Sequence, residues 1–134
     1  MQRRHFLKHA CIASAGLLTG CPSTPKGPAG YQASVQDDKL VVPRSNLSPG
    51  TILAVEWHNK RIGLAQVSEQ TYRASLMRCT HLGCALDTAD GGYVCPCHGA
   101  KFDSAGNLLK GPAAKNLQVF ATSIDEQNIY IHTR

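Results

Sequence analysis

Two short stretches of sequence, C-T-H-L-G-C at residues 79–84 and C-P-C-H-G at residues 95–99, decide what kind of fold this chain adopts. Each stretch places a cysteine two or three residues before a histidine, so together they offer two thiolates and two imidazoles. Thiolates suit zinc or iron–sulfur centres, and imidazole suits zinc, copper and iron. The stretches therefore predict a metal centre held between two loops. Its candidate ligands are Cys79, His81, Cys95 and His98.

The composition around these stretches favours loops rather than an apolar core. Residues 79–112 contain four cysteines, two histidines and six glycines. Such a segment cannot bury enough apolar surface to order itself, so we expect a bound metal and a disulfide to hold it together. It is predicted to form a small loop-rich subdomain at about residues 77–113.

Farther out, the chain alternates short apolar segments with turns, which is typical of β-strands. No window after the N-terminal segment has the period of a long amphipathic helix. We therefore predict an all-β fold, an antiparallel sandwich or barrel, in a domain spanning residues 37–134. The expected strands are residues 39–42, 51–57, 61–67, 71–78, 117–124 and 128–132.

Both cysteine–histidine stretches resemble, at every position, the C-x-H-x-G-C and C-P-C-H-G motifs of the Rieske iron–sulfur family. The resemblance continues more weakly across residues 39–132. It implies a Rieske-like β fold and one [2Fe–2S] cluster, with two cysteines on one iron and two histidines on the other. Neutral nitrogen ligands remove negative charge from that iron and raise its potential. The implied function is one-electron transfer.

The resemblance also implies a role for the two remaining loop cysteines, Cys84 and Cys97. In the branch of the family that works outside the cytoplasm, cysteines at these positions form a disulfide that clamps the loops, whereas oxygenase-type Rieske domains lack them. Disulfides persist in oxidising compartments. Two alternatives stay open: all four loop cysteines as a disulfide framework with bystander histidines, and a structural zinc site with the same four ligands.

The N-terminal segment is similar to a bacterial export signal. Residues 2–8, Q-R-R-H-F-L-K, resemble a twin-arginine signal. The apolar run at residues 10–18 is shorter than the roughly 20 residues that a membrane-spanning helix needs. Leu18-Thr19-Gly20-Cys21 resembles a lipobox, so residues 1–20 are predicted to be a signal peptide removed before a lipidated Cys21. An uncleaved N-terminal helix with incidental cysteines is the alternative.

Residues 21–36 are predicted to form a flexible tether between the lipid and the domain. The segment 22–30 holds three prolines and two glycines and favours neither helix nor strand. Two acyl chains on one cysteine would anchor the protein stably to a bacterial membrane, facing the periplasm or the exterior.

The charge balance excludes an extended nucleic-acid surface. The formal net charge is +5, but three of the basic residues fall in the first twenty positions, which hold no acid. The remainder has 11 basic and 9 acidic residues, a net charge of +2 (11 − 9). Such a balance argues against a basic groove for nucleic acid.

Two positions depart from the quinol-oxidising members of the family. Those members commonly carry a serine and a tyrosine whose hydroxyls face cluster sulfur, and this chain has Ala100 and Phe102 at those positions. We therefore expect a lower potential than theirs.

The leading hypothesis is a small lipid-anchored electron carrier, or the electron-transfer subunit of an oxidoreductase, rather than a stand-alone enzyme; its redox partner protein is not identified by the sequence. The twin-arginine signal followed by a Rieske domain is similar to arsenite oxidase small subunits. The first alternative is the iron–sulfur subunit of a quinol–cytochrome c oxidoreductase. The second is a non-redox binding module stabilised by zinc or disulfides.

Overall fold

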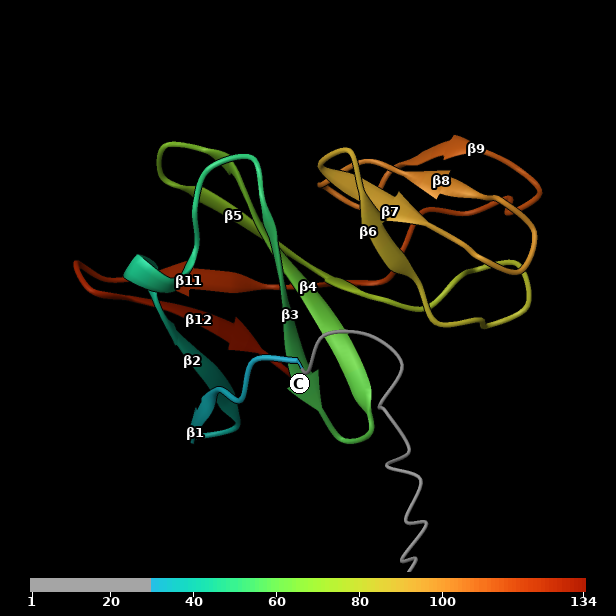
Figure 1. Ribbon diagram of the computed structural model, residues 1–134. Coiled ribbons are helices and arrows are strands. Elements are labelled where there is room, and N and C mark those ends of the chain that lie inside the picture. The colour runs from blue at the N-terminus through green and yellow to red at the C-terminus, as the bar shows by residue number, and fades with distance from the viewer. Residues whose placement is uncertain (1–29) are drawn as a thin grey trace, which may run out of the picture.

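Three four-stranded sheets make up residues 30–134, the part of the chain that the computed structural model describes (Figure 1). The first sheet has the order β1–β2–β12–β11, formed by Ser34–Gln36, Lys39–Pro43, Asn128–His132 and Thr122–Ile124. The second has the order β10–β5–β4–β3, formed by Val119–Phe120, Thr71–Leu76, Lys60–Ser68 and Ile52–Trp57. The third has the order β6–β7–β8–β9, formed by Asp87–Ala89, Gly92–Val94, Lys101–Phe102 and Leu108–Lys110.

Every pairing between neighbouring strands is antiparallel, and one short 3-10 helix, Arg44–Asn46, follows β2. The all-β prediction is therefore confirmed. In the described part of the chain, no helix is long and apolar enough to cross a membrane. The predicted signal peptide and Cys21 lie outside the described residues.

The first two sheets form a base around one apolar cluster, because their strands turn β-branched and leucine side chains toward each other. In β12, for example, Ile129 and Ile131 are fully buried, while their neighbours along the strand are partly exposed, which is the period of a half-buried strand. The buried members of this cluster are Leu40, Val42, Leu47, Val55, Ile62, Leu64, Tyr72, Ala74, Ile129 and Ile131.

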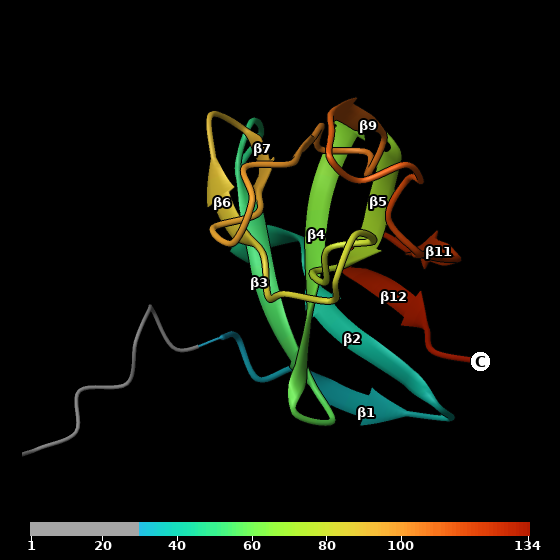
Figure 2. The ribbon, with the colours of Figure 1, turned by 90° about the vertical axis from the view of Figure 1, so that its right-hand side faces the viewer.

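The third sheet stands beside the base (Figures 1 and 2). It packs around a second apolar cluster of its own. Its strands are two or three residues long, too short for a periodic pattern, and the sequence did not predict them as strands. Turn chemistry sets their register instead. Asp90 and Gly91 both have positive φ, 52° and 72°, and close a two-residue hairpin between β6 and β7.

Two predicted segments differ from the structure. Residues 117–124 were expected as one strand, but the chain breaks at Ala121, so that β10 pairs with β5 in one sheet and β11 with β12 in another. Residues 30–36 were expected in the tether, but Tyr31 donates its amide to Ala54 O (2.7 Å) and β1 pairs with β2. These residues follow the proline-rich stretch, and their free N–H groups can pair with a sheet edge.

Candidate metal centre

The two motif loops have the same backbone hydrogen bonds. In the first loop, Cys79 N–H donates to Cys84 O (2.8 Å), and Gly83 N–H donates to Cys79 O (2.9 Å). In the second, Cys95 N–H donates to Ala100 O (2.8 Å), and Gly99 N–H donates to Cys95 O (2.9 Å). Gly83 and Gly99 both have positive φ, 76° and 79°, a conformation that other residues rarely adopt. The glycine of each motif is therefore needed to close its loop.

The first cysteines of the loops are buried, unpaired and next to each other. Cys79 is 3% exposed and Cys95 1% exposed, and both are free thiols in the same apolar cluster. Burial raises the pKa of Cys79. Burial also acts to raise the pKa of Cys95, but the backbone N–H groups of His98 and Cys97 outweigh it, so that this pKa is lowered. The second loop thus directs amide dipoles at the Cys95 sulfur.

The two histidines follow these cysteines in their loops, and their rings lie side by side at the surface. The ring centroids of His81 and His98 are 5.0 Å apart, and the rings meet edge to face at 84°. Both side chains are exposed. The fold thus groups the predicted ligand residues by type, with two buried sulfurs in one apolar cluster and two solvent-facing imidazoles in edge-to-face contact.

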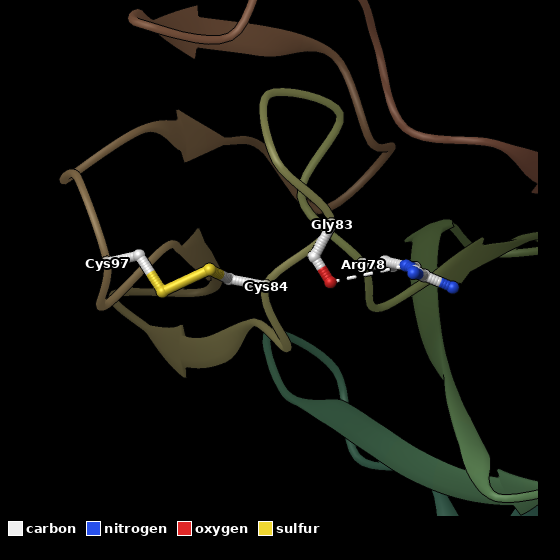
Figure 3. Close-up of a disulfide and its surroundings, with 4 residues drawn as sticks. All are labelled: Arg78, Gly83, Cys84 and Cys97. Carbon is white, nitrogen blue, oxygen red and sulfur yellow. Dashed lines mark hydrogen bonds between the residues drawn. A yellow bond between two sulfur atoms is a disulfide. The ribbon is translucent and has the colours of Figure 1, made fainter.

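A disulfide joins the loops. Cys84 and Cys97 are bonded, with their Cα atoms 6.6 Å apart, and Figure 3 shows the bond linking the two loops beside Arg78. The Cys95 sulfur lies within 4.8 Å of both disulfide sulfurs. The predicted pairing is confirmed, and the alternative in which all four loop cysteines form disulfides disagrees with the free thiols of Cys79 and Cys95.

A third loop packs on the first. The hydroxyl of Thr80, between two predicted ligands, donates to Lys115 O (2.7 Å), and Ala113 is buried in the same apolar cluster as the free thiols. Leu82, the residue after His81 in the first loop, does not pack into this cluster and is 68% exposed. Its side chain is therefore available to a partner.

The chain is similar to known proteins in sequence and in fold. A family model described as Rieske [2Fe-2S] domain matches residues 37–121. The chain belongs to the Rieske family. The Rieske subunit of the mitochondrial cytochrome b-c1 complex of Zea mays is 34% identical over 118 residues, covering 66% of this chain and 43% of the relative. The ubiquinol–cytochrome c reductase iron–sulfur subunit of Cereibacter sphaeroides is 48% identical over 58 residues, covering 40% of this chain and 31% of the relative.

Among solved structures, the plasma membrane Rieske protein of Synechocystis PCC 6803 matches with a TM-score of 0.54 and 32% identity, over 60% of this chain and 84% of that one. The matched region covers less than half the length of the two curated Rieske relatives, the Zea mays and Cereibacter sphaeroides subunits. The chemistry of the donor set fits the family's [2Fe–2S] cluster, which needs two ligands for each iron.

The two departures from the quinol-oxidising Rieske proteins are buried beside the cluster loops. Ala100 is fully buried and Phe102 is 1% exposed, and both belong to the apolar cluster that contains Cys79 and Cys95. Neither side chain can donate a hydrogen bond to sulfur. The wall of the site on this side is therefore apolar.

The sequence did not predict the roles of two residues, Tyr93 and Gly63, that bear on how the Rieske site is positioned. Tyr93 lies on β7, two residues before Cys95, and its hydroxyl is buried without a hydrogen-bond partner in the described residues, as is that of Ser75. A Cβ placed at Gly63 would overlap the Tyr93 ring and hydroxyl. The glycine on β4 thus makes room for a tyrosine from the third sheet, and no local sequence pattern signals this pairing.

Proposed function

We propose that this Rieske protein carries single electrons at the outer face of a bacterial membrane, with Cys79, His81, Cys95 and His98 as the ligands of its cluster. The observation that carries the proposal is the grouping of two free buried thiols and two exposed imidazoles on loops of identical backbone design. When bound, the cluster supplies reversible storage of one electron.

The cysteines and the histidines have different roles: the thiols hold the cluster, and the imidazoles face the redox partner. The thiols lie in the apolar cluster, so that the cysteine side of the site is dry and fixed. The imidazole rings face solvent, which gives an electron its shortest path to a partner. The Cys84–Cys97 disulfide holds the loops together and keeps the spacing of the four donors when the charge of the site changes.

Cluster content tests the ligand assignment. The purified protein is expected to hold two irons and two acid-labile sulfides per chain, to absorb visible light and to give a reduced-state EPR signal of mixed histidine and cysteine ligation. His81→Ala and Cys95→Ser are expected to lose this signal, whereas His132→Ala, on β12 of the base, is expected to keep it. A colourless protein that contains zinc would refute the proposal and favour the structural zinc site.

The proposed location is supported by the disulfide and by the resemblance of residues 1–21 to a twin-arginine lipoprotein signal. In a bacterial host, replacing Arg3 and Arg4 by lysine is expected to leave the protein in the cytoplasm, and Cys21→Ser is expected to abolish labelling with radioactive palmitate. Cys11→Ser is the matched control and is expected to be lipidated normally. Absence of palmitate from both the wild-type and the Cys11→Ser protein would exclude the lipid anchor.

The similarity to cytochrome b-c1 subunits favours a second candidate, the iron–sulfur subunit of a quinol–cytochrome c oxidoreductase. The absence of hydroxyls at Ala100 and Phe102 argues against it, because it is expected to lower the potential. Co-purification with a b-type cytochrome, together with quinol-dependent cytochrome c reduction, would favour this second candidate over a free-standing carrier.

A further inference from the structure

We propose that the electron-transfer partner presents an acidic surface, which docks on a rim of three lysines, Lys101, Lys110 and Lys115, beside the exposed histidines. This inference rests on the proposed function and names the partner class of the same site. We call these three residues the lysine rim.

The strand register places two of the rim lysines directly opposite each other. Lys101 on β8 pairs with Lys110 on β9 in an antiparallel ladder, so both side chains stand on the same face of the sheet, and both are exposed. Like charges at directly opposed positions destabilise a sheet. A lysine on the edge strand β9 protects that edge from strand pairing, but this reason does not apply to Lys101 on the inner strand β8.

The rim lies at the cluster end of the third sheet. Lys101 directly follows Ala100, whose carbonyl closes the second loop, and Lys110 is its partner across the ladder. The carbonyl of Lys115 accepts the hydroxyl of Thr80 in the first loop, so the third lysine stands beside the other loop. All three side chains are exposed, and none forms an ion pair within residues 30–134.

The acidic residues of the same sheet are mostly at its other end. Asp90 lies in the β6–β7 turn, and Asp103 follows β8, where its carboxylate accepts the amides of Ala105 and Asn107. Asp87 is the exception: it stands at the cluster end on the opposite edge strand β6, two strands from Lys101, or about 10 Å. The sheet is therefore polarised, with positive charge toward the histidines.

The exposed Leu82 completes the surface. It lies next to His81 in the first loop and is 68% exposed. An apolar contact near the electron exit, flanked by lysines, suits a partner whose redox centre is ringed by carboxylates, because opposite charges steer encounter and apolar contact shortens the distance.

Two inorganic oxidants of opposite charge test the inference without knowledge of the partner. The reduced, cluster-loaded full-length protein in neutral detergent is mixed with ferricyanide or with tris(phenanthroline)cobalt(III), and both rate constants are measured by stopped flow. Their ratio within one protein isolates the charge of the surface, because a change in midpoint potential affects both reactions in the same direction.

At low ionic strength, Lys101→Gln/Lys110→Gln is expected to lower the ferricyanide-to-cobalt ratio by about tenfold, and high salt is expected to remove the difference. The matched control, Lys39→Gln/Arg73→Gln, removes the same net charge from β2 and β5 of the base and is expected to change the ratio by less than about twofold.

An unchanged ratio in the rim variant, or an equal fall in both variants, would overturn the lysine rim and leave the electron-transfer proposal standing. Failure of the wild-type protein to reduce either oxidant would instead refute the proposed function itself, and the rim with it.

Discussion

Ala100 lies in the wall of the site, at a position where quinol-oxidising Rieske proteins commonly carry a hydroxyl. It is fully buried and closes the second ligand loop through its carbonyl, which accepts the amide of Cys95 at 2.8 Å. The alanine methyl offers the sulfurs of the site no hydrogen-bond donor. We therefore expect the residue at this position to influence the potential, because a hydroxyl there could donate to sulfur.

Ala100→Ser is expected to raise the midpoint potential. A hydrogen bond to a charged acceptor contributes about 1.5–3 kcal/mol, which corresponds to about 65–130 mV for one electron. Redox titration followed by EPR measures the shift, with Ala89→Ser at the exposed end of β6 as the control. An Ala100→Ser potential equal to that of the wild type would show that the missing hydroxyl does not tune the site.

Gly63 and Tyr93 form a contact between the base and the third sheet. A Cβ at Gly63 would overlap the Tyr93 ring, so Gly63→Ala is expected to lower the free energy of unfolding by about 1–3 kcal/mol through overpacking. Denaturant unfolding of the cluster-loaded protein measures this loss. Unchanged stability would mean that Tyr93 can leave its position at no cost.

Tyr93 also makes the free energy of unfolding depend on pH in the alkaline range. Burial raises the pKa of its phenol, so the native state keeps a proton that the unfolded chain loses above pH of about 10. The unfolded state then binds fewer protons, and stability falls as pH rises, by up to about 1.4 kcal/mol for each pH unit. Tyr93→Phe is expected to flatten this part of the pH profile. A profile with the same slope in both proteins would contradict the buried phenol.

At the scale of elements, the disulfide stabilises the two loops as one unit. The double variant Cys84→Ala/Cys97→Ala opens a cross-link across 13 residues, so the expected loss of unfolding free energy is about 3 kcal/mol. Visible absorbance at raised temperature should also fade faster in the variant than in the wild type. Equal bleaching half-lives would mean that the loops hold their arrangement without the clamp.

The base strands could be predicted from sequence because their signals are local. Residues 128–132 alternate in burial as a half-buried strand should, and β2, β3 and β4 begin or end within a residue or two of their predicted bounds. The two-residue strand β8 offers no period to detect, and the break at Ala121 depends on which sheet each neighbour joins. The Tyr93–Gly63 contact is likewise set by tertiary packing alone.

The candidate ligands could be predicted for a different reason, namely that each motif carries its own turn chemistry. Gly83 and Gly99 take up positive φ in equivalent positions of the two loops. Within each loop the backbone then sets where the cysteine and the histidine lie, so residue order was enough to pair them loop by loop. Their convergence across the two loops was implied by resemblance and could not be derived from spacing.

At the scale of the whole molecule, the separate apolar clusters of the base and the third sheet predict unequal stability. Removing the metal should unfold the third sheet first, because its cluster contains the thiols, while the base keeps its own core. Hydrogen exchange of the metal-free protein is expected to show protected amides in β2, β4 and β12 and exchanged amides in β6–β9. Uniform loss of protection would show that the two parts unfold together.

Two histidines and two cysteines of this chain are expected to hold its [2Fe–2S] cluster. Pulsed EPR of the reduced protein, labelled with ¹⁵N only at histidine, detects the histidine ligands. Strong coupling to two histidine nitrogens is expected in the wild-type protein. In His81→Ala and His98→Ala it is expected to fall to one nitrogen or to disappear with the signal. Coupling to no histidine nitrogen, or a paramagnetic centre that survives both substitutions unchanged, would contradict this ligand assignment.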